Sequence, residues 1–291
     1  MAILLDANSR IICQGLTGAT ATFHCEKSIA YGSNFVGGVR PGKGGDTHLG
    51  LPIFDSVDEA KSSTSADVSL VFVPPQSAAD AIIESIDAKI PLIVCVTERV
   101  PVLDMVRVKK ALEGSSSRLI GPNSQGIITP EQSKVGVMPT HRHFAGPIGV
   151  ISRSASLTYE AIDQLYSVRL GQTTSIGVGG DAVHGIDYVE CLELFLADPK
   201  TEGVLLIGEI GGTAEEEMAD FLKHNKAKKP VAAYIAGKHA PTDRRMGHAG
   251  TVNVFGKGSA AEKNEALAAA GVHIADSAAV IGTTMRLALG R

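Results

Sequence analysis

The sequence predicts an α/β fold built on parallel sheets, and three observations carry this prediction. Short β-branched apolar runs alternate with stretches of helical periodicity along nearly all of the 291 residues. Several runs, such as 68–73, are apolar on both faces, as strands are when helices cover both sides of a sheet. The 32 glycines suit sharp turns from strand to helix, where a positive φ or the close approach of a ligand is needed.

The first half of the chain predicts a repeated strand–helix pattern. The segment 10–14 is a predicted strand, and a glycine turn and a helix to about residue 30 follow it. A second strand ends at Val39. The stretch 76–89 places Ala79, Ile82, Ile83 and Ile86 on one helical face. Further strands are predicted at 68–73, 92–96 and 119–120, with a helix at 102–112.

The alternation lapses between residues 121 and 146 and then restarts. Prolines, glycines and polar residues in the lapse predict an ordered linker with a small hairpin. Beyond it we predict strands at 148–152, 173–178, 203–208, 231–236 and 272–275, and helices at 156–168, 186–197, 214–226, 259–270 and from 277. Strict alternation implies right-handed crossovers. At about 150 residues per domain, the length also suggests two domains, which we place on either side of 123–146.

The composition excludes several classes of protein. The 27 Lys+Arg against 31 Asp+Glu give a net charge of −4, whereas a protein that binds nucleic-acid phosphates carries a basic excess. No apolar run approaches the roughly 20 residues of a membrane span, and the first residues lack the features of a signal or transit segment. The 4 cysteines form no CxxC pair, and His141 and His143 have no third ligand nearby. We therefore expect a cytoplasmic protein that binds no metal, nucleic acid or membrane.

Two glycine loops follow the first two predicted strands, at the sheet edge where open parallel sheets bind ligands. In the first, Gly15 and Gly18 precede hydroxyl residues that open a helix, whose N–H groups and dipole would face a phosphate. A plain turn explains this loop equally well. The second loop, 39–45, offers Lys43 to a phosphate, although a basic surface loop is the simpler interpretation of it alone. Together the two loops suggest a phosphorylated, nucleotide-like ligand.

Small hydroxyl residues follow two further strands. Asn123 and Ser124 come after the strand at 119–120. Ser152 ends the strand at 148–152, and Arg153, Ser154 and Ser156 follow it where the next helix begins. Capping of that helix accounts for one serine. The alternative is an oxyanion or phosphate cradle made of the same N–H groups, and capping explains three serines with an arginine between them less well.

Glu209 and His248 are the candidate catalytic pair. Glu209 directly follows an apolar strand, where a carboxylate needs a donor; helix capping by its neighbours, with Glu209 only at the rim, is the alternative. His248 lies between Gly247 and Gly250 in a long polar loop, with cations close by. Imidazole is a competent nucleophile toward phosphorus, and a carboxylate on one ring nitrogen would leave the other free to attack. For a histidine taken alone, a hydrogen-bonded surface residue is the commoner case.

The motifs resemble those of a known family. The chain is similar over essentially its full length to the α subunit of succinyl-CoA synthetase (succinate–CoA ligase). The resemblance rests on GLTGATATFH, VGGVRPGKGG, THLGLPIFDSV, the GPN at Gly121, SRS…LTYEA, GVGGD, IGEIGG and RMGHAG.

The resemblance implies a fold, a mechanism and a partner. It implies a CoA-binding Rossmann-like domain over 1–122, a linker or hairpin over 123–146, and a flavodoxin-like domain over 147–291. A β subunit with an ATP-grasp domain would bind ATP or GTP and Mg²⁺. The nucleotide would phosphorylate His248, whose ring Glu209 orients; the phosphoryl group would pass to a dicarboxylate, and CoA would attack the acyl phosphate.

The resemblance also assigns binding residues. Those expected to contact CoA are Thr17, Gly18, Ala19, Thr20, Lys43, Val96, Thr97 and Glu98. Those expected around the phosphohistidine and the acid are Asn123, Ser124, Ser154, Ala155, Ser156 and Tyr159.

Two departures from the family pattern fall on these loops. The family usually has GPNCPG, and here Ser124-Gln125 replaces Cys-Pro. It usually has SRSGT, and here Ala155 adds a methyl group where glycine would let an anion approach closely. Because a site that discriminates by hydrogen bonds can change preference with one such group, we hypothesise an acid besides or instead of succinate: malate, itaconate or sulfinopropionate.

Two other classes of function are weighed against the ligase. A CoA-binding regulatory module would keep the fold but has no need for His248 opposite Glu209. An NAD-dependent dehydrogenase would call for GxGxxG and an acidic residue after the second strand, where this chain has Arg40 and Lys43.

Overall fold

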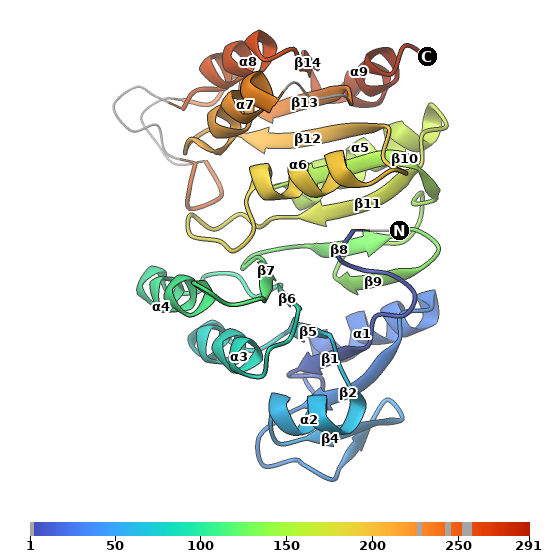
Figure 1. The fold of residues 1–291 in the computed structure, drawn as a ribbon, viewed down its shortest axis with the longest axis vertical. Coiled ribbons are helices and arrows are strands. Elements are labelled where there is room, and N and C mark those ends of the chain that lie inside the picture. The colour runs from blue at the N-terminus through green and yellow to red at the C-terminus, as the bar shows by residue number, and fades with distance from the viewer. Residues whose placement is uncertain (1–2, 226–228, 242–245, 252–257) are drawn as a thin grey trace. The chain divides into compact units, whose positions relative to one another are not determined.

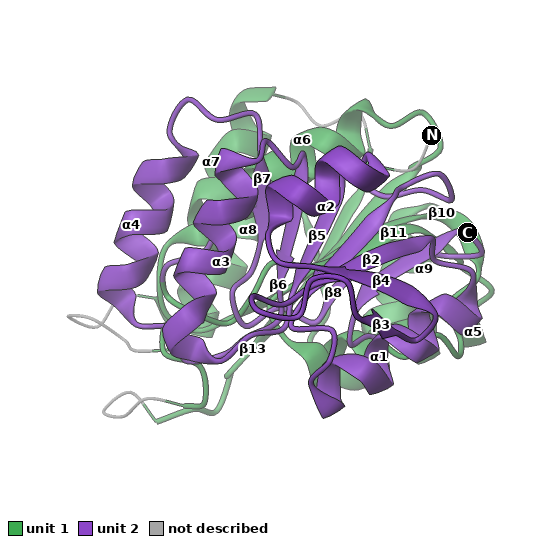
Figure 2. Cartoon of the chain, turned by 90° about the horizontal axis from the view of Figure 1, so that it is seen from below, with its two compact units in different colours: residues 1–3, 139–182, 187–291 green, residues 4–138, 183–186 purple. Residues whose placement is uncertain are grey.

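The computed structural model describes residues 3–225, 229–241, 246–251 and 258–291. It divides into two compact units, coloured in Figure 2. The N-terminal unit contains residues 4–138 and 183–186, and the C-terminal unit contains residue 3 together with 139–182 and 187–291. Within the described ranges, no helix combines the length and apolar character that a bilayer span requires.

The N-terminal unit is a doubly wound sheet. Its strands, in the order β3-β4-β2-β1-β5-β6-β7, are parallel except for the antiparallel β3–β4 pair. The chain therefore winds outward in opposite directions from β1 and β5, and the switch point lies between these two strands. The strands are β1 (Ile11–Gln14), β2 (Phe35–Val39), β3 (Thr47–His48), β4 (Leu51–Phe54), β5 (Val68–Val71), β6 (Leu92–Cys95) and β7 (Arg118–Ile120).

Four helices belong to this unit: α1 (Ala19–Tyr31), α2 (Val57–Thr64), α3 (Pro75–Asp87) and α4 (Val102–Leu112). Helix α3 packs against both α2 and α4 (Figure 1). Its first residue, Pro75, has its φ preset for a helix. As predicted, Ala79, Ile82 and Ile86 are buried, and Ile83 packs at the margin of the same core.

A hairpin lies within the segment 121–146. It consists of β8 (Gly126–Thr129) and β9 (Ser133–Gly136), which pair antiparallel with Gly126 opposite Gly136. Both glycines have a positive φ, and a Cβ on Gly126 would lie 2.0 Å from the Val135 carbonyl oxygen. Only glycine fits at this end of the hairpin.

The C-terminal unit contains a parallel sheet of five strands in the order β14-β13-β12-β10-β11. Counted within this unit alone, the order is 2-1-3-4-5, that of flavodoxin-like folds, with the switch point between β10 and β12. The strands are β10 (Ala145–Ser152), β11 (Gln172–Gly177), β12 (Gly203–Glu209), β13 (Val231–Ala236) and β14 (His273–Ile274).

Helices form two groups on this second sheet. Helix α5 packs on α9, and α7 packs on both α6 and α8 (Figure 1). The core under α5 and α9 joins Val150 and Ile207 of the sheet to Ile162 and Met285 of the helices. The helices are α5 (Ala155–Ser167), α6 (Tyr188–Ala197), α7 (Ala214–Asn225), α8 (Ala260–Ala269) and α9 (Ile281–Ala288), with a 3₁₀ turn η1 (Ala278–Val280) before the last.

The predicted α/β fold with two parallel sheets is confirmed. The predicted elements recur within a few residues of their expected ends, whereas β3, β4 and α2 were not predicted. Helix α2 has eight residues, and only Val57 and Ala60 in it are buried. So short and polar a segment carries too little apolar periodicity to be recognised.

Candidate active site

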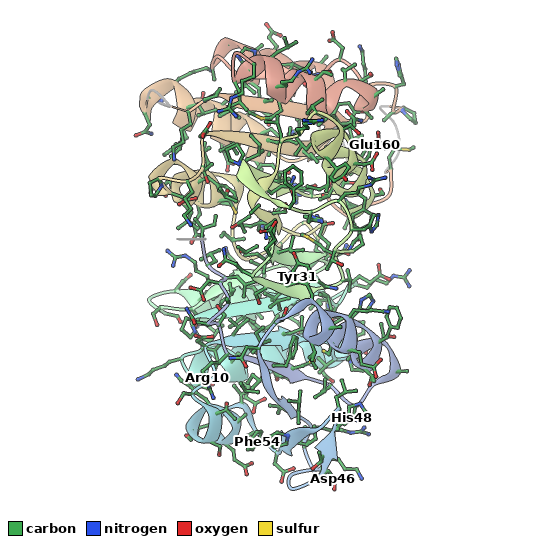
Figure 3. All side chains as sticks on the ribbon, turned by 90° about the vertical axis from the view of Figure 1, so that its right-hand side faces the viewer. Arg10, Tyr31, Asp46, His48, Phe54 and Glu160 are labelled. Atoms are coloured by element: carbon green, nitrogen blue, oxygen red, sulfur yellow. The ribbon has the colours of Figure 1, made fainter. Side chains whose placement is uncertain are left out.

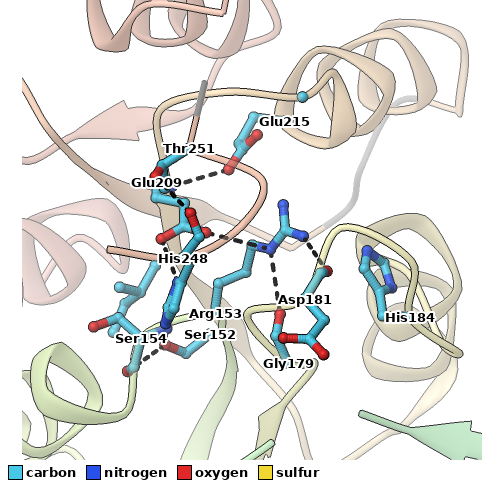
Figure 4. A network of polar contacts seen from close by, with 12 residues as sticks. Ser152, Arg153, Ser154, Gly179, Asp181, His184, Glu209, Glu215, His248 and Thr251 are labelled. Carbon is cyan, nitrogen blue, oxygen red and sulfur yellow. Dashed lines mark hydrogen bonds and ion pairs between the residues drawn. The ribbon is translucent and has the colours of Figure 1, made fainter. Parts of the chain in front are cut away.

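The candidate site of the C-terminal unit lies at the switch point of its sheet. Strand β10 ends at Ser152, directly before Arg153, and the neighbouring strand β12 ends at Glu209. His248 comes from the loop after β13. Figure 4 shows these side chains gathered at the carboxyl ends of the strands.

His248 and Glu209 are in direct contact. The Nδ1 atom of His248 lies 2.7 Å from Oε2 of Glu209 (Figure 4). The Glu209 side chain is 9% exposed and the imidazole 30%, so the carboxylate lies beneath a ring that solvent still reaches. Glu209 selects the neutral tautomer with hydrogen on Nδ1, which leaves the lone pair on Nε2. The hydrogen bond with Glu209 raises the pKa of His248, against the opposing effect of burial.

A threonine closes the turn that carries His248. The Thr251 hydroxyl oxygen lies 2.7 Å from the carbonyl oxygens of both Met246 and His248, which share its one hydrogen, and it accepts the Met246 N–H at 3.1 Å. Thr251 is buried. Of the polar residues that the sequence places in this loop, Asp243, Arg244 and Arg245 lie outside the described residues.

Gly180 makes room for the imidazole. A Cβ on Gly180 would lie 2.6 Å from both Cδ2 and Nε2 of His248. Real Cβ atoms do not approach other atoms so closely, so the ring packs on bare backbone. In the sequence, GVGGD is visible only as a family motif, and no role was predicted for Gly180.

Arg153 lies behind the carboxylate. Its guanidinium donates to the carbonyl oxygens of Gly179, at 3.3 Å, and Asp181, at 3.2 Å. Its Nε atom is 3.8 Å from Oε1 of Glu209, and both side chains are buried. A buried carboxylate requires such a partner, and Arg153 compensates the charge of Glu209 without occupying the oxygen that contacts His248.

The serines after β10 are held largely by local hydrogen bonds. Ser154 is the N-cap of α5 and accepts the Leu157 N–H at 3.3 Å. The Ser152 hydroxyl accepts the Ser154 N–H at 3.1 Å and donates to the Ser154 carbonyl at 3.0 Å. Ala155 and Ser156, in the first turn, are exposed. Tyr159 is partly buried, and burial raises its pKa. A structural role therefore accounts for two serines, and the proposed cradle stays a prediction.

The N-terminal unit has a cavity of about 760 Å³ at its own switch point. Gly15 has a φ of +85°, and a Cβ there would lie 2.5 Å from the Phe72 carbonyl oxygen, so glycine lets the first loop approach the end of β5. Two of the residues assigned to CoA, Thr17 and Gly18, line the cavity, and Ala19 and Thr20 begin α1 directly after them. The lining also includes Arg40, Pro41, Phe72, Val73, Pro74 and Ser77.

The loop carrying Lys43 is held by Asp55. One carboxylate oxygen of Asp55 accepts the N–H groups of Lys43, at 3.0 Å, and Gly44, at 2.9 Å; the bond to Gly44 is the main reason why its pKa is lowered. The Lys43 side chain is exposed, 3.6 Å from Asp46. Asp46 and His48 lie at this end of the unit (Figure 3). Lys43 is not among the cavity-lining residues.

The other residues assigned to CoA follow β6. The Thr97 hydroxyl donates to the Val73 carbonyl at 2.7 Å, so Thr97 contacts a cavity-lining residue although 96–98 do not line the cavity themselves. Asn123 and Ser124 follow β7 in the N-terminal unit, and the Asn123 N–H donates to the Thr97 carbonyl at 2.8 Å. Their assignment to the phosphate or acid stays a prediction.

No metal centre is evident in the part of the chain that the structure describes. Among the described residues, no group of three or more His, Cys, Asp or Glu side chains is arranged so that it could hold a metal ion.

Comparison with known proteins decides the family. A "CoA binding domain" model matches residues 6–99, and a "CoA-ligase" model matches 151–273. The chain is 48% identical over 285 residues to the succinate–CoA ligase [ADP-forming] subunit alpha of Staphylococcus epidermidis, covering 98% of this chain and 94% of that protein. The Staphylococcus aureus protein of the same name is 47% identical with the same coverage.

The chain belongs to the succinate–CoA ligase alpha subunit family. The predicted resemblance is thus confirmed, and with it the enzyme class, an acid–CoA ligase alpha subunit with a CoA-binding domain. An alpha subunit of this family implies a beta partner.

More distant solved structures share the fold of this succinate–CoA ligase family member. ATP citrate lyase from Methanothrix soehngenii, in complex with citrate and coenzyme A, matches with a TM-score of 0.87 at 22% identity, covering 99% of this chain and 50% of that one. The dinucleotide-forming acetyl-coenzyme A synthetase 1 of Ca. Korarchaeum cryptofilum matches with a TM-score of 0.75 at 20% identity, covering 93% and 58%. At such identities the likeness is one of fold.

Proposed function

We propose that this chain is the alpha subunit of a dicarboxylate–CoA ligase that passes a phosphoryl group through His248. The observation that carries the proposal is the 2.7 Å contact between Nδ1 of His248 and the buried carboxylate of Glu209. It leaves Nε2 as the nucleophilic atom, at the sheet edge where open α/β folds carry out chemistry.

The residues suit three successive transfers. In the first, Nε2 of His248 attacks the terminal phosphorus of the nucleoside triphosphate, and the bond to the leaving diphosphate breaks. Glu209 holds the Nδ1 proton and balances the positive charge that develops on the ring. A carboxylate oxygen of the acid then takes the phosphoryl group from Nε2 to form an acyl phosphate. Finally the CoA sulfur attacks the acyl carbon and inorganic phosphate leaves.

The nucleotide is assigned to the partner. We propose a beta subunit with an ATP-grasp domain that binds ATP or GTP together with Mg²⁺, which would neutralise phosphate charge during transfer. In the described part of this chain, no group of acidic and histidine side chains forms a site for the ion itself.

The cavity at the β1–β5 switch point is proposed to receive CoA. Gly18, at the N-cap of α1, has no side chain that competes for the helix N–H groups. Arg40 adds a cation beside them, 2.5 Å from the Thr17 hydroxyl. A helix N-terminus with a guanidinium next to it suits the phosphates of CoA.

Succinate is the first candidate acid, because the curated relatives are named for it. Malate, itaconate and sulfinopropionate stay open because of the two departures from the family pattern. Ala155 is exposed in the first turn of α5, and Gln125 is buried.

The test is the phosphoenzyme and its discharge. The complex purified with its partner is incubated with Mg-ATP or Mg-GTP at neutral to alkaline pH, and its peptides are analysed by mass spectrometry. We expect phosphate on the peptide containing His248, lost on adding CoA together with the physiological acid but retained with CoA alone, because the acid is what accepts the phosphoryl group. The acid that discharges it fastest identifies the substrate. A chain that is never phosphorylated would instead be a CoA-binding regulatory module.

Adding one methyl group at Gly180 should disturb the nucleophile. Because a Cβ there would overlap the imidazole, we expect Gly180→Ala to slow phosphorylation at least about tenfold, since small misplacements of reacting groups are costly. Gly250→Ala is the matched control: it adds the same methyl group in the histidine loop, where the nearest atom is 3.9 Å away. Initial rates of phosphate incorporation compare the two. Equal rates would mean that the ring is not held against Gly180.

A further inference from the structure

A buried ion pair lies directly behind the candidate site. Lys263 of α8 and Glu215 of α7 are both 0% exposed, with Nζ 2.6 Å from Oε2. The lysine also donates to Glu216 Oε2 at 2.8 Å and to the Gly212 carbonyl at 3.0 Å, which uses the three donors of an ammonium group. Neither residue contacts His248, and the proposed function assigns no role to either.

The second oxygen of Glu215 reaches the strand that carries Glu209. Glu215 Oε1 accepts the backbone N–H of Glu209 at 3.0 Å (Figure 4). A Cβ on Gly208 would lie 2.5 Å from this oxygen, so the absence of a side chain at Gly208 is what lets the carboxylate reach the strand. One residue therefore carries both contacts: the backbone of Glu209 binds Glu215, and its side chain binds His248.

The position of Lys263 is fixed by the way α8 begins. It follows the N-terminus of α8, where Ser259 and Glu262 form a reciprocal capping box. Just before that helix, the Gly258 carbonyl accepts the Gly211 N–H at 2.8 Å. The start of α8 and the loop after Glu209 are thus joined at two points, by this bond and by the bond from Lys263 to Gly212.

Stability alone does not account for such a pair. Taking two charges out of water is costly, and apolar residues of similar volume often replace a buried ion pair without loss of stability. What apolar residues cannot supply is an acceptor for the Glu209 N–H. We propose that Glu215 is a positioning residue, which fixes the backbone of Glu209 and so holds its carboxylate against the His248 ring, while Lys263 balances the buried charge of Glu215. The proposal rests on the proposed function of that pair.

Two double variants separate position from charge. Glu215→Gln with Lys263→Met removes both charges but keeps a carbonyl acceptor for the Glu209 N–H. Glu215→Met with Lys263→Met has nearly the same volume and no acceptor. Asp220→Asn with Lys223→Met is the control, because it removes an exposed pair on α7, 3.3 Å apart.

Two readouts are taken on the full chain and its complex with the partner. The pKa of His248 is measured by NMR titration of its ring, and the rate of phosphorylation by phosphate incorporation. The groups that act on this ring are Glu209, Arg153 and Asp181, and none of them is changed. We expect the Gln/Met variant to keep the raised pKa and a rate within about threefold of wild type. In the Met/Met variant we expect the pKa to fall toward its ordinary value and the rate to fall at least about tenfold, with the KM for CoA unchanged.

The outcomes are distinct. A folded Met/Met variant with wild-type pKa and rate would overturn the proposal. If that variant does not fold, the Gln/Met variant decides: loss of the raised pKa in a folded protein would equally overturn it, and retention supports it. A wild-type chain that is never phosphorylated would refute the proposed function, while the NMR comparison would still test the positioning.

Discussion

Replacing His248 with asparagine is expected to give a subunit that assembles with its partner and binds CoA but is never phosphorylated. The imidazole Nε2 is the only atom in the proposed sequence that carries the phosphoryl group from nucleotide to acid, so no partial pathway remains. Loss of a nucleophile costs on the order of 10⁴-fold or more in other enzymes that form covalent intermediates. Overall acyl-CoA formation should therefore fall to the background rate.

The control is a second histidine in the same unit. His224 lies on the exposed end of α7, where its Nδ1 atom is 2.8 Å from the Asp220 carbonyl, and His224→Asn should keep full activity. Phosphate incorporation and acyl-CoA formation are both measured, and CoA binding by calorimetry shows that the N-terminal unit is intact. Substantial phosphorylation of the His248→Asn complex would place the phosphoryl group on another residue and contradict the proposal.

Sequence periodicity was sufficient to predict the architecture. Buried parallel strands such as β5 and β12 are apolar on both faces, and the helices between them repeat at 3.6 residues. The order of strands places the end of β12 beside the end of β10, so Glu209 and Arg153 could be expected at one edge. The contact of Glu209 with His248 could only be hypothesised, because 39 residues separate them and the loop after β13 that carries His248 has no periodic pattern.

The residues that sequence analysis missed act through shape or through long-range pairing. Gly180 contributes an absent side chain, which is visible only when the imidazole is seen packed against it. Lys263 and Glu215 are 48 residues apart and, in the sequence, are ordinary charges near the starts of two helices, where a solvated position is the usual expectation. Thr251 had a local signal, a hydroxyl residue closing a glycine turn, and could have been found on that ground.

The same limit applies to the CoA cavity. The two glycine loops were recognised from their composition, but the lining also includes Phe72 and Ser77, which come from the end of β5 and the start of α3. In the sequence, Val73, a double proline and Gln76 separate them, and the prolines indicate only that the strand ends there. That this segment faces the loop after β1 follows from the pairing of β1 with β5, which the order of elements along the chain does not specify.

Replacing Glu209 with glutamine should change both the rate of phosphorylation and its dependence on pH. The hydrogen bond with the carboxylate is the main cause of the raised pKa of His248, and burial together with Arg153 acts in the opposite direction. Without the carboxylate the opposing effects remain, so the pKa should fall. The amide can also present its NH₂ group to Nδ1 and so select the wrong tautomer, and a comparable change in another enzyme costs about 10⁴-fold. We expect a loss of about 10²–10⁴-fold.

The direction of the pH dependence follows from the protonation state that can react. In the wild-type enzyme, His248 is protonated on both nitrogens below its raised pKa and has no lone pair for attack, so the rate of phosphorylation should rise with pH through that pKa and then level off. In Glu209→Gln the residual rate should level off at a lower pH. Stability changes in the opposite direction: the raised pKa stabilises the folded state below the ordinary histidine pKa of about 6.5. This stabilisation is lost as pH rises through the raised pKa of the folded state. The free energy of unfolding of wild type should therefore exceed that of the variant most at acid pH.

Rate profiles for wild type and Glu209→Gln, together with denaturant unfolding at several pH values, test both directions at once. Glu202→Gln serves as the control, because Glu202 pairs with Arg291 on the surface of the same unit and is remote from the proposed chemistry. A variant that keeps the wild-type rate and the wild-type midpoint of the pH profile would show that Glu209 does not orient the ring. A lower rate with an unchanged midpoint would separate the two roles, since it would leave the carboxylate important for transfer but not for the protonation of His248.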